Sequence, residues 1–154
     1  MQKRHHFSTY FTATVIGALL ATTGSPVWAD EAAKSKPLAL RKIMQDLGKN
    51  TQTITYGISR ENWERVAGAA ASIADHPQPP LTERMRILGF VGSDAGKFKG
   101  YDEKTHQAAR SLEQAANRSD GQAVISAFAT LQSSCLACHQ SFRKPFEEHF
   151  YGQR

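Results

Sequence analysis

Near its end the 154-residue chain carries a C-x-x-C-H string, formed by Cys135, Cys138 and His139. The sequence contains two cysteines in total, and both belong to this string. Three chemistries use cysteines at such spacing: a disulfide redox pair, half of a zinc site, and the covalent attachment of a haem. The surrounding sequence has to discriminate among them.

The first two chemistries suit the context poorly. In redox C-x-x-C motifs the reactive thiolate lies at a helix N-terminus next to a strand, whereas Cys135 and Cys138 lie well inside a helical pattern. A closed zinc site needs four nitrogen or sulfur ligands. His76, His106 and His149 could be recruited only from distant positions without metal-ligand spacing, and we interpret them as partly exposed polar residues.

Covalent haem attachment uses the whole string. Two thiols three positions apart can each add to a vinyl group on one porphyrin edge, and the adjacent His139 then falls under the iron. In bacteria this attachment is made outside the cytoplasm, so the interpretation requires export. We therefore favour haem and keep the disulfide and zinc alternatives.

The N-terminal segment predicts that export. Lys3 and Arg4 precede an apolar run over residues 11–20, and Val27 and Ala29 supply a small-residue cleavage pattern. The run is short and Thr-rich for a membrane span, so we predict a cleaved signal peptide over residues 1–29 and one mature domain over residues 30–154. An uncleaved anchor is the alternative. We expect no membrane span in the mature chain.

The charge balance limits the partners. The 19 Lys and Arg residues exceed the 14 Asp and Glu residues, and the net charge of +5 falls to +3 once Lys3 and Arg4 leave with the signal peptide. No block of five like charges exists, so nucleic acid binding has little support. Lysines at positions 97, 99 and 104 either form a docking patch for an acidic partner or belong to a solvated surface.

Hydrophobic residues at helical spacing predict an all-α fold, an antiparallel four-helix bundle with a long crossover loop between the second and third helices. We expect the first helix over residues 36–57 after a cap at Ser35 with Pro37 in its first turn, and the second from Ser59 to residue 76. The crossover covers residues 77–100, with a short helical piece inside 81–90.

The last two predicted helices follow the crossover. Asp102 should cap the third helix, which stops near residues 117–121, and Ser119 should cap the fourth, which carries the C-x-x-C-H string. Pro145 should end or kink this fourth helix. Because the inner faces are rich in alanine and fill space poorly, we expect something else to occupy the interior of the bundle.

A single C-x-x-C-H near the C-terminus, continued as CHQSFR in the last of four helices, resembles the class II cytochromes c, meaning cytochrome c′ and its low-spin relative cytochrome c556. The similarity extends from RKIMQDLGKN through GSDAGKFKG to CLACHQSFR. It implies one covalent haem c, with Cys135 and Cys138 as thioether positions and His139 as the proximal iron ligand. Arg143 would then tune the proximal side or contact a haem propionate, unless it simply faces solvent.

The resemblance leaves the sixth iron position to be assigned. In cytochrome c′ an apolar side chain of the first helix covers the distal face, whereas in the c556 type a methionine of that helix closes it. Met44 lies four positions before a glycine, as in the c556 pattern, and is the favoured ligand. The alternatives are that Met44 fills the core, that Gln45 points inward, or that Met85 competes. Arg41 either approaches a propionate or forms a surface salt bridge.

These inferences predict a periplasmic electron-transfer protein, and no enzyme, with His139 and Met44 as axial ligands of one haem c. Its partners would be periplasmic or membrane-bound redox proteins. The alternative function is a five-coordinate cytochrome c′ that binds or scavenges small gases such as nitric oxide. Because class II relatives often pair through their first two helices, the resemblance allows a homodimer, and Trp63 would lie either in that interface or in the core.

Overall fold

The computed structural model describes residues 37–152, so the predicted signal peptide and Ser35 lie outside the described residues. Within them every regular element is helical, and none of these helices has the length and apolar character needed to cross a membrane. The elements are α1 (Ala39–Ser59), α2 (Trp63–Ala74), α3 (Leu81–Val91), the short 3-10 helix η1 (Gly92–Asp94), α4 (Ala95–Asn117) and α5 (Gly121–Tyr151).

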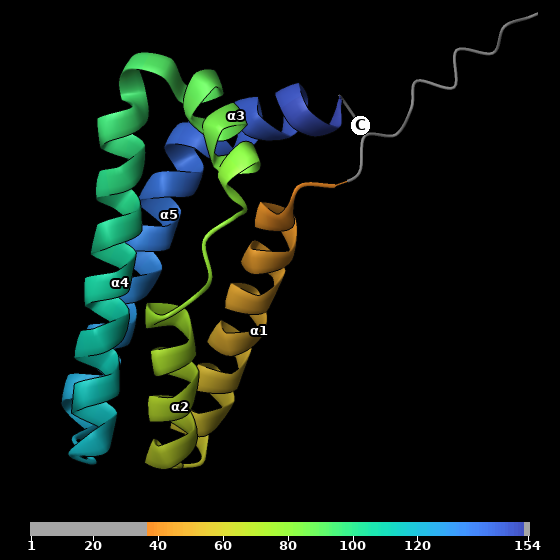
Figure 1. Cartoon of the computed structure of the whole chain (residues 1–154). Coiled ribbons are helices and arrows are strands. Elements are labelled where there is room, and N and C mark those ends of the chain that lie inside the picture. Colours follow the sequence, from red (N-terminus) through yellow and green to blue (C-terminus); the bar gives the residue numbers. More distant parts are fainter. Residues whose placement is uncertain (1–36, 153–154) are drawn as a thin grey trace, which may run out of the picture. The chain divides into compact units, whose positions relative to one another are not determined.

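The predicted antiparallel four-helix bundle is confirmed, with α1, α2, α4 and α5 as its members (Figure 1). Helix α1 packs on α2, α2 on α4, and α4 on α5, whereas α1 and α5 share few contacts. Helix α3 belongs to the crossover, where the sequence predicted a short helical piece. The α1–α5 side is therefore the least tightly closed side of the bundle.

The start of α1 differs from the prediction. The helix begins at Ala39, so Pro37 precedes it, and Leu38 at the N-cap position has no polar side chain to offer. The carboxylate of Glu83 takes over this role, accepting hydrogen bonds from the backbone N–H groups of Ala39 at 2.7 Å and Leu40 at 2.8 Å. Helix α3 thereby fixes the beginning of α1.

The turn between α1 and α2 also differs from the prediction, in which the second helix began at Ser59. Ser59 ends α1, and α2 opens at Trp63 after Asn62, whose side chain accepts a hydrogen bond from the N–H of Arg65 at 3.0 Å. A Cβ added to Gly57 would lie 2.7 Å from Cγ2 of Val66. The two helices approach here so closely that only glycine fits at position 57.

Two predicted caps of the later helices are wrong. Helix α4 already begins at Ala95, directly after η1, so Asp102 lies inside the helix and caps nothing. Packing on α2 and α5 outweighs the weak helix propensity of the glycines in its first turns. Ser119 has a left-handed backbone conformation (φ 54°), and Asp120 caps α5 by accepting a hydrogen bond from the N–H of Ala123 at 3.0 Å.

Pro145 does not end α5, which continues to Tyr151. The helix changes direction in its C-terminal part (Figure 1). Proline has no backbone N–H to donate and its ring crowds the preceding turn, which explains the bend. The residues beyond it are held by aromatic contacts, among them a T-shaped pair of Phe90 and Phe146 with centroids 5.8 Å apart.

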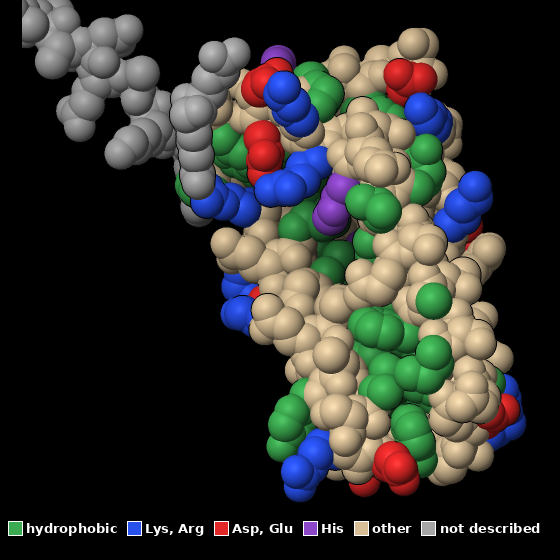
Figure 2. Space-filling model, turned by 180° about the vertical axis from the view of Figure 1, so that it is seen from behind, with side chains coloured by type: hydrophobic (Ala, Val, Ile, Leu, Met, Phe, Trp, Pro, Cys, Tyr) green, Lys and Arg blue, Asp and Glu red, His purple; other side chains and the backbone are tan. Residues whose placement is uncertain are grey.

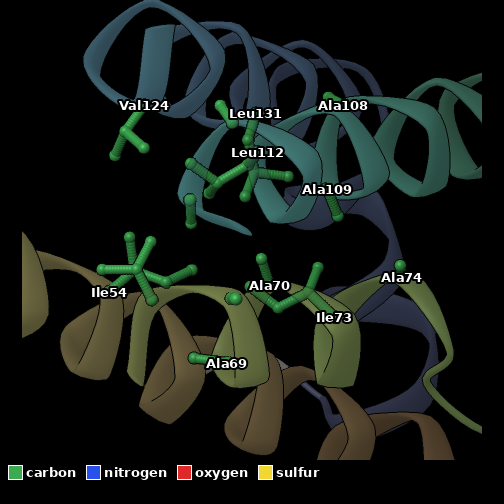
Figure 3. Close-up of a cluster of buried hydrophobic side chains, with 14 residues drawn as sticks. Ile54, Ala69, Ala70, Ile73, Ala74, Ala108, Ala109, Leu112, Val124 and Leu131 are labelled. Carbon is green, nitrogen blue, oxygen red and sulfur yellow. The ribbon is translucent and has the colours of Figure 1, made fainter. Parts of the chain in front are cut away.

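The buried side chains form two separate clusters. The alanine-rich cluster fills the end of the bundle near the α1–α2 turn and includes Ile54, Ala70, Leu112 and Leu131 (Figure 3). The aromatic cluster lies at the other end, around Leu38, Ile87 and Phe146 with Leu40, Phe90, Phe98, Phe150 and Tyr151 against them. Ile43 of α1 and Phe142 of α5 are buried but belong to neither cluster. The hydrophobic core is thus interrupted in the N-terminal part of α1 and in the C-terminal half of α5.

Candidate functional site

The C-x-x-C-H string lies on α5 at this interruption. Cys135 is half-buried and packs against the alanine-rich cluster, Cys138 is half-buried, and His139 is exposed. Two pairs of hydroxyl groups hold α5 against α4 on either side of the string: Ser134 Oγ lies 3.2 Å from Thr105 Oγ1, and Ser141 Oγ lies 3.3 Å from Tyr101 Oη. The string therefore projects from a helix that is fixed both before and after it.

The two thiols are free and not acidified. Burial raises the pKa of Cys135, and burial together with the charge of Asp102 raises the pKa of Cys138 to about 11. Reactive redox cysteines and thiolate metal ligands have instead a lowered pKa. This environment disfavours both the redox-pair and the zinc interpretations of the string.

The pKa of His139 is shifted in the opposite direction from the pKa values of the two cysteines. Partial burial and the positive charge of Arg143 lower its pKa, so the imidazole is neutral at pH 7 and its nitrogen lone pair is available to a metal. Arg143 itself forms an ion pair with Glu147, with 3.3 Å between Nε and Oε1. Both charged groups line an open pocket together with Leu136, His139, Gln140 and Lys144.

Figure 2 shows one face of the protein, where hydrophobic side chains lie in a recess beside a histidine and near basic side chains. Hydrophobic side chains that are left open to solvent within a recess can pack against an apolar group that enters it. Such a surface suits a flat macrocycle with an apolar body and charged edges.

Met44 lies in the part of α1 where the hydrophobic core is interrupted. Leu38, just before α1, and Leu40 join the aromatic cluster, and Leu47 and Ile54 join the alanine-rich one, which leaves Ile43 and Met44 between them. Because α1 and α5 run in opposite directions, this N-terminal stretch of α1 lies at the level of the C-terminal half of α5 (Figure 1). Met44 is 42% exposed, whereas Ile43 is 7% exposed, so Met44 is not a core filler. Gln45 is exposed as well.

The remaining predicted residues are dispersed. The Arg41 guanidinium lies over the Tyr151 ring, 5.4 Å from its centroid, at the C-terminal end of α5. Met85 is 62% exposed on α3. Trp63 is partly buried, packs against the alanine-rich cluster and lies close to Gly121, where an added Cβ would be 3.3 Å from the indole ring.

A further cluster lies between the end of α2 and α4, and consists of the predicted polar residues His76 and His106 together with Asp102, which was predicted as a cap. His76 Nε2 is 3.5 Å from Oδ1 of Asp102, and His106 Nε2 is 3.4 Å from Oδ2 of the same carboxylate. The two imidazole rings stack, with centroids 4.6 Å apart. The i, i+4 spacing of Asp102 and His106 was visible in the sequence, but the approach of His76 requires the packing of α2 on α4.

Comparison with known proteins supports a haem site. Residues 87–143 match the family model described as Cytochrome C′. The matched segment contains the whole C-x-x-C-H string and ends at Arg143, but it does not reach α1 or Met44. No significant match was found among curated proteins or solved structures. The segment that carries the string is thus similar to the Cytochrome C′ family.

The donor set agrees with haem c. Two neutral thiols three positions apart, a neutral imidazole next to the second, and an exposed thioether on the neighbouring helix supply the attachment and ligation chemistry of this group. The pocket beside His139 contains an apolar side chain, Leu136, and the cations Arg143 and Lys144. The residues present therefore fit haem c.

Proposed function

We propose that the protein is a periplasmic electron carrier with one haem c, attached through Cys135 and Cys138 and ligated by His139 and Met44. The observation that carries this proposal is the position of these four residues. Cys135 packs against the alanine-rich cluster, Cys138 and His139 follow it on α5, and Met44 lies on α1 between the residues that join the two clusters, which supports a shared site.

Each residue would have a separate task. Cys135 and Cys138 would hold the group by thioether bonds, and the neutral His139 would be the proximal ligand. Met44 would close the distal side, and a thioether ligand favours the reduced metal. When bound, haem supplies an iron that gains and loses a single electron, and no substrate is changed covalently.

The arginines would act at the edge of the site. Arg143 shares the open pocket with His139 and is a candidate for the propionate or proximal contact. Arg41 of α1 lies over Tyr151, the last residue of α5, and would reach a propionate only from the C-terminal end of α5. Redox proteins of the periplasm or its bounding membrane would be the partners, and pairing of two copies through α1 and α2 belongs to the same proposal.

A second candidate function is binding of small gases at a five-coordinate iron. It is favoured by the burial of Ile43, which neighbours Met44 and points into the protein while Met44 is largely exposed. In this alternative the apolar Ile43 would cover the distal side, and Met44 would remain at the surface.

Visible spectra of the purified holoprotein discriminate between the two functions. The electron carrier should have a low-spin ferric spectrum with the far-red charge-transfer band of methionine-ligated haem, and the reduced protein should not take up CO. A high-spin ferric spectrum together with rapid CO uptake would overturn the proposed axial ligation and favour the gas-binding function.

A further inference from the structure

We propose that His76, Asp102 and His106 form a second metal site, which binds Zn²⁺ and uses none of the proposed haem ligands. The three residues offer one ligand atom each, and these atoms all lie within 4.8 Å of one another. Among the residues that the structure describes, no other group of His, Cys, Asp and Glu side chains converges in this way.

The packing of α2 on α4 builds this cluster. Ala74, near the end of α2, faces α4 across a contact lined by small residues such as Ala109 (Figure 3). Small side chains let the two helices approach closely. An ion pair between Arg110 of α4 and Asp75, with 3.1 Å between Nη2 and Oδ1, fixes the end of α2 further. His76 is thereby placed over the α4 turn that carries Asp102 and His106.

Backbone carbonyls fix both imidazoles in one tautomer. His106 Nδ1 bonds to the carbonyl oxygen of Ala74, and His76 Nδ1 lies 3.2 Å from the carbonyl oxygen of Pro77. A carbonyl oxygen only accepts hydrogen bonds, so both Nδ1 atoms carry the proton. When a ring is neutral, its Nε2 lone pair is therefore directed toward Asp102. Histidines that ligate metals typically donate their other ring N–H to such an acceptor.

The cluster brings acceptor atoms together without enough hydrogen-bond donors, and a bound cation would compensate for this. Two Nε2 lone pairs face a carboxylate, which is itself an acceptor, so neutral rings leave the contact without a donor. Protons on both Nε2 atoms would supply donors, but they would place two positive rings in stacked contact at 4.6 Å. The hydrogen bond to Asp102 raises the pKa of His76, and a proton on His76 Nε2 alone would still leave His106 without a donor toward the carboxylate. A divalent cation satisfies all three groups and leaves the rings neutral.

The dimensions suit zinc. With bonds of about 2.0–2.1 Å, neighbouring ligand atoms of a tetrahedral zinc ion lie roughly 3.3 Å apart. The two Nε2 atoms lie 3.5 and 3.4 Å from different oxygens of the Asp102 carboxylate, and one ligand atom from each residue lies within 4.8 Å of the others, so small side-chain movements would close them around one ion. The His76 side chain is 8% exposed and that of Asp102 is 42% exposed, so the site is partly buried yet open on one side. Three ligands and an open fourth position correspond to a zinc ion that keeps one water.

Equilibrium dialysis of untagged holoprotein tests the site. A chelator first removes bound metal, and an alkylating agent blocks any thiol that carries no haem. The protein is then dialysed against zinc, and the zinc and iron bound per chain are measured. We expect one zinc per chain in the wild type and in His149→Gln, which changes a histidine outside the cluster. In His106→Gln and Asp102→Asn the zinc affinity should fall at least tenfold.

Two outcomes would overturn the zinc site: a wild type that takes up no zinc, or equal binding by wild type, His106→Gln and Asp102→Asn. Circular dichroism verifies the fold of each variant. If His106→Gln does not fold, thermal unfolding decides, because zinc should raise the midpoint of the wild type and leave that of Asp102→Asn unchanged. The zinc count does not depend on haem, since iron is measured separately, so failure of the haem proposal would be recognised independently.

Discussion

Glu83 and Ala39 are joined by a 2.7 Å hydrogen bond from the backbone N–H of Ala39 to the Glu83 carboxylate, although 44 positions separate them in the chain. The same carboxylate also accepts from Leu40. We predict that Glu83→Ala lowers the free energy of unfolding by about 1–2 kcal/mol, because it removes the cap of α1. Urea unfolding measures this, with Glu148→Ala, an exposed glutamate of α5, as the control. Equal effects of the two substitutions would contradict the capping role.

The turn between α1 and α2 gives a second prediction. Gly57→Ala should destabilise the protein by about 1–3 kcal/mol, because the new methyl group would overlap the fully buried Val66. Gly48→Ala, in the same helix, should stabilise it by up to about 1 kcal/mol, since an added Cβ there meets nothing within 4 Å. Thermal or urea unfolding of both variants checks the contrast, and two changes of the same sign would refute it.

The helical periodicity was enough to predict the bundle, but not its helix ends. The spacing of Leu112 and its neighbours on α4 predicts an inner face because burial follows the 3.6-residue period. The cap of α1 could not be predicted, because Leu38 has no capping side chain and Glu83 comes from another helix. Asp102 was misassigned as a cap for a related reason: its real contacts are with His76, just after the end of α2, and with His106.

The pKa of the Cys138 thiol, raised to about 11 from an ordinary 9.0, gives a prediction for the haem-free protein. A raised pKa means less thiolate at a given pH, and two units correspond to about 100-fold less at pH 8. A thiolate of higher pKa is also more nucleophilic, which offsets part of this difference. In a haem-free Cys135→Ser variant, iodoacetamide should therefore alkylate the folded chain at least about tenfold more slowly than the urea-unfolded chain. Similar rates in both states would show that burial does not suppress this thiol.

Met44 gives a prediction about axial ligation. Met44→Ala should abolish the far-red methionine band of the ferric holoprotein and allow the reduced protein to bind CO, because the sixth ligand is removed. Met85→Ala is the matched control, since Met85 is an exposed methionine of α3 and should leave both spectra unchanged. A Met44→Ala spectrum identical to that of the wild type would exclude Met44 as a ligand.

The candidate site was only partly predictable. The C-x-x-C-H string is local in sequence, so Cys135, Cys138 and His139 could be singled out directly. That Met44 lies along α1 where the core is interrupted follows only from the packing of the two clusters. Its exposure could not be deduced from periodicity, because Ile43 and Met44 are neighbours and the pattern does not decide which of them points inward.

Covalent attachment of haem at Cys135 and Cys138 is the claim on which the proposed function depends. It is tested most directly by the intact mass of protein exported by a host that attaches haem c, together with the pyridine spectrum of the denatured protein. We predict one additional haem mass per chain, a c-type pyridine spectrum, and loss of both in the Cys135→Ser/Cys138→Ser double variant. A wild-type chain that carries no added haem mass and gives no c-type spectrum under these conditions would contradict the account.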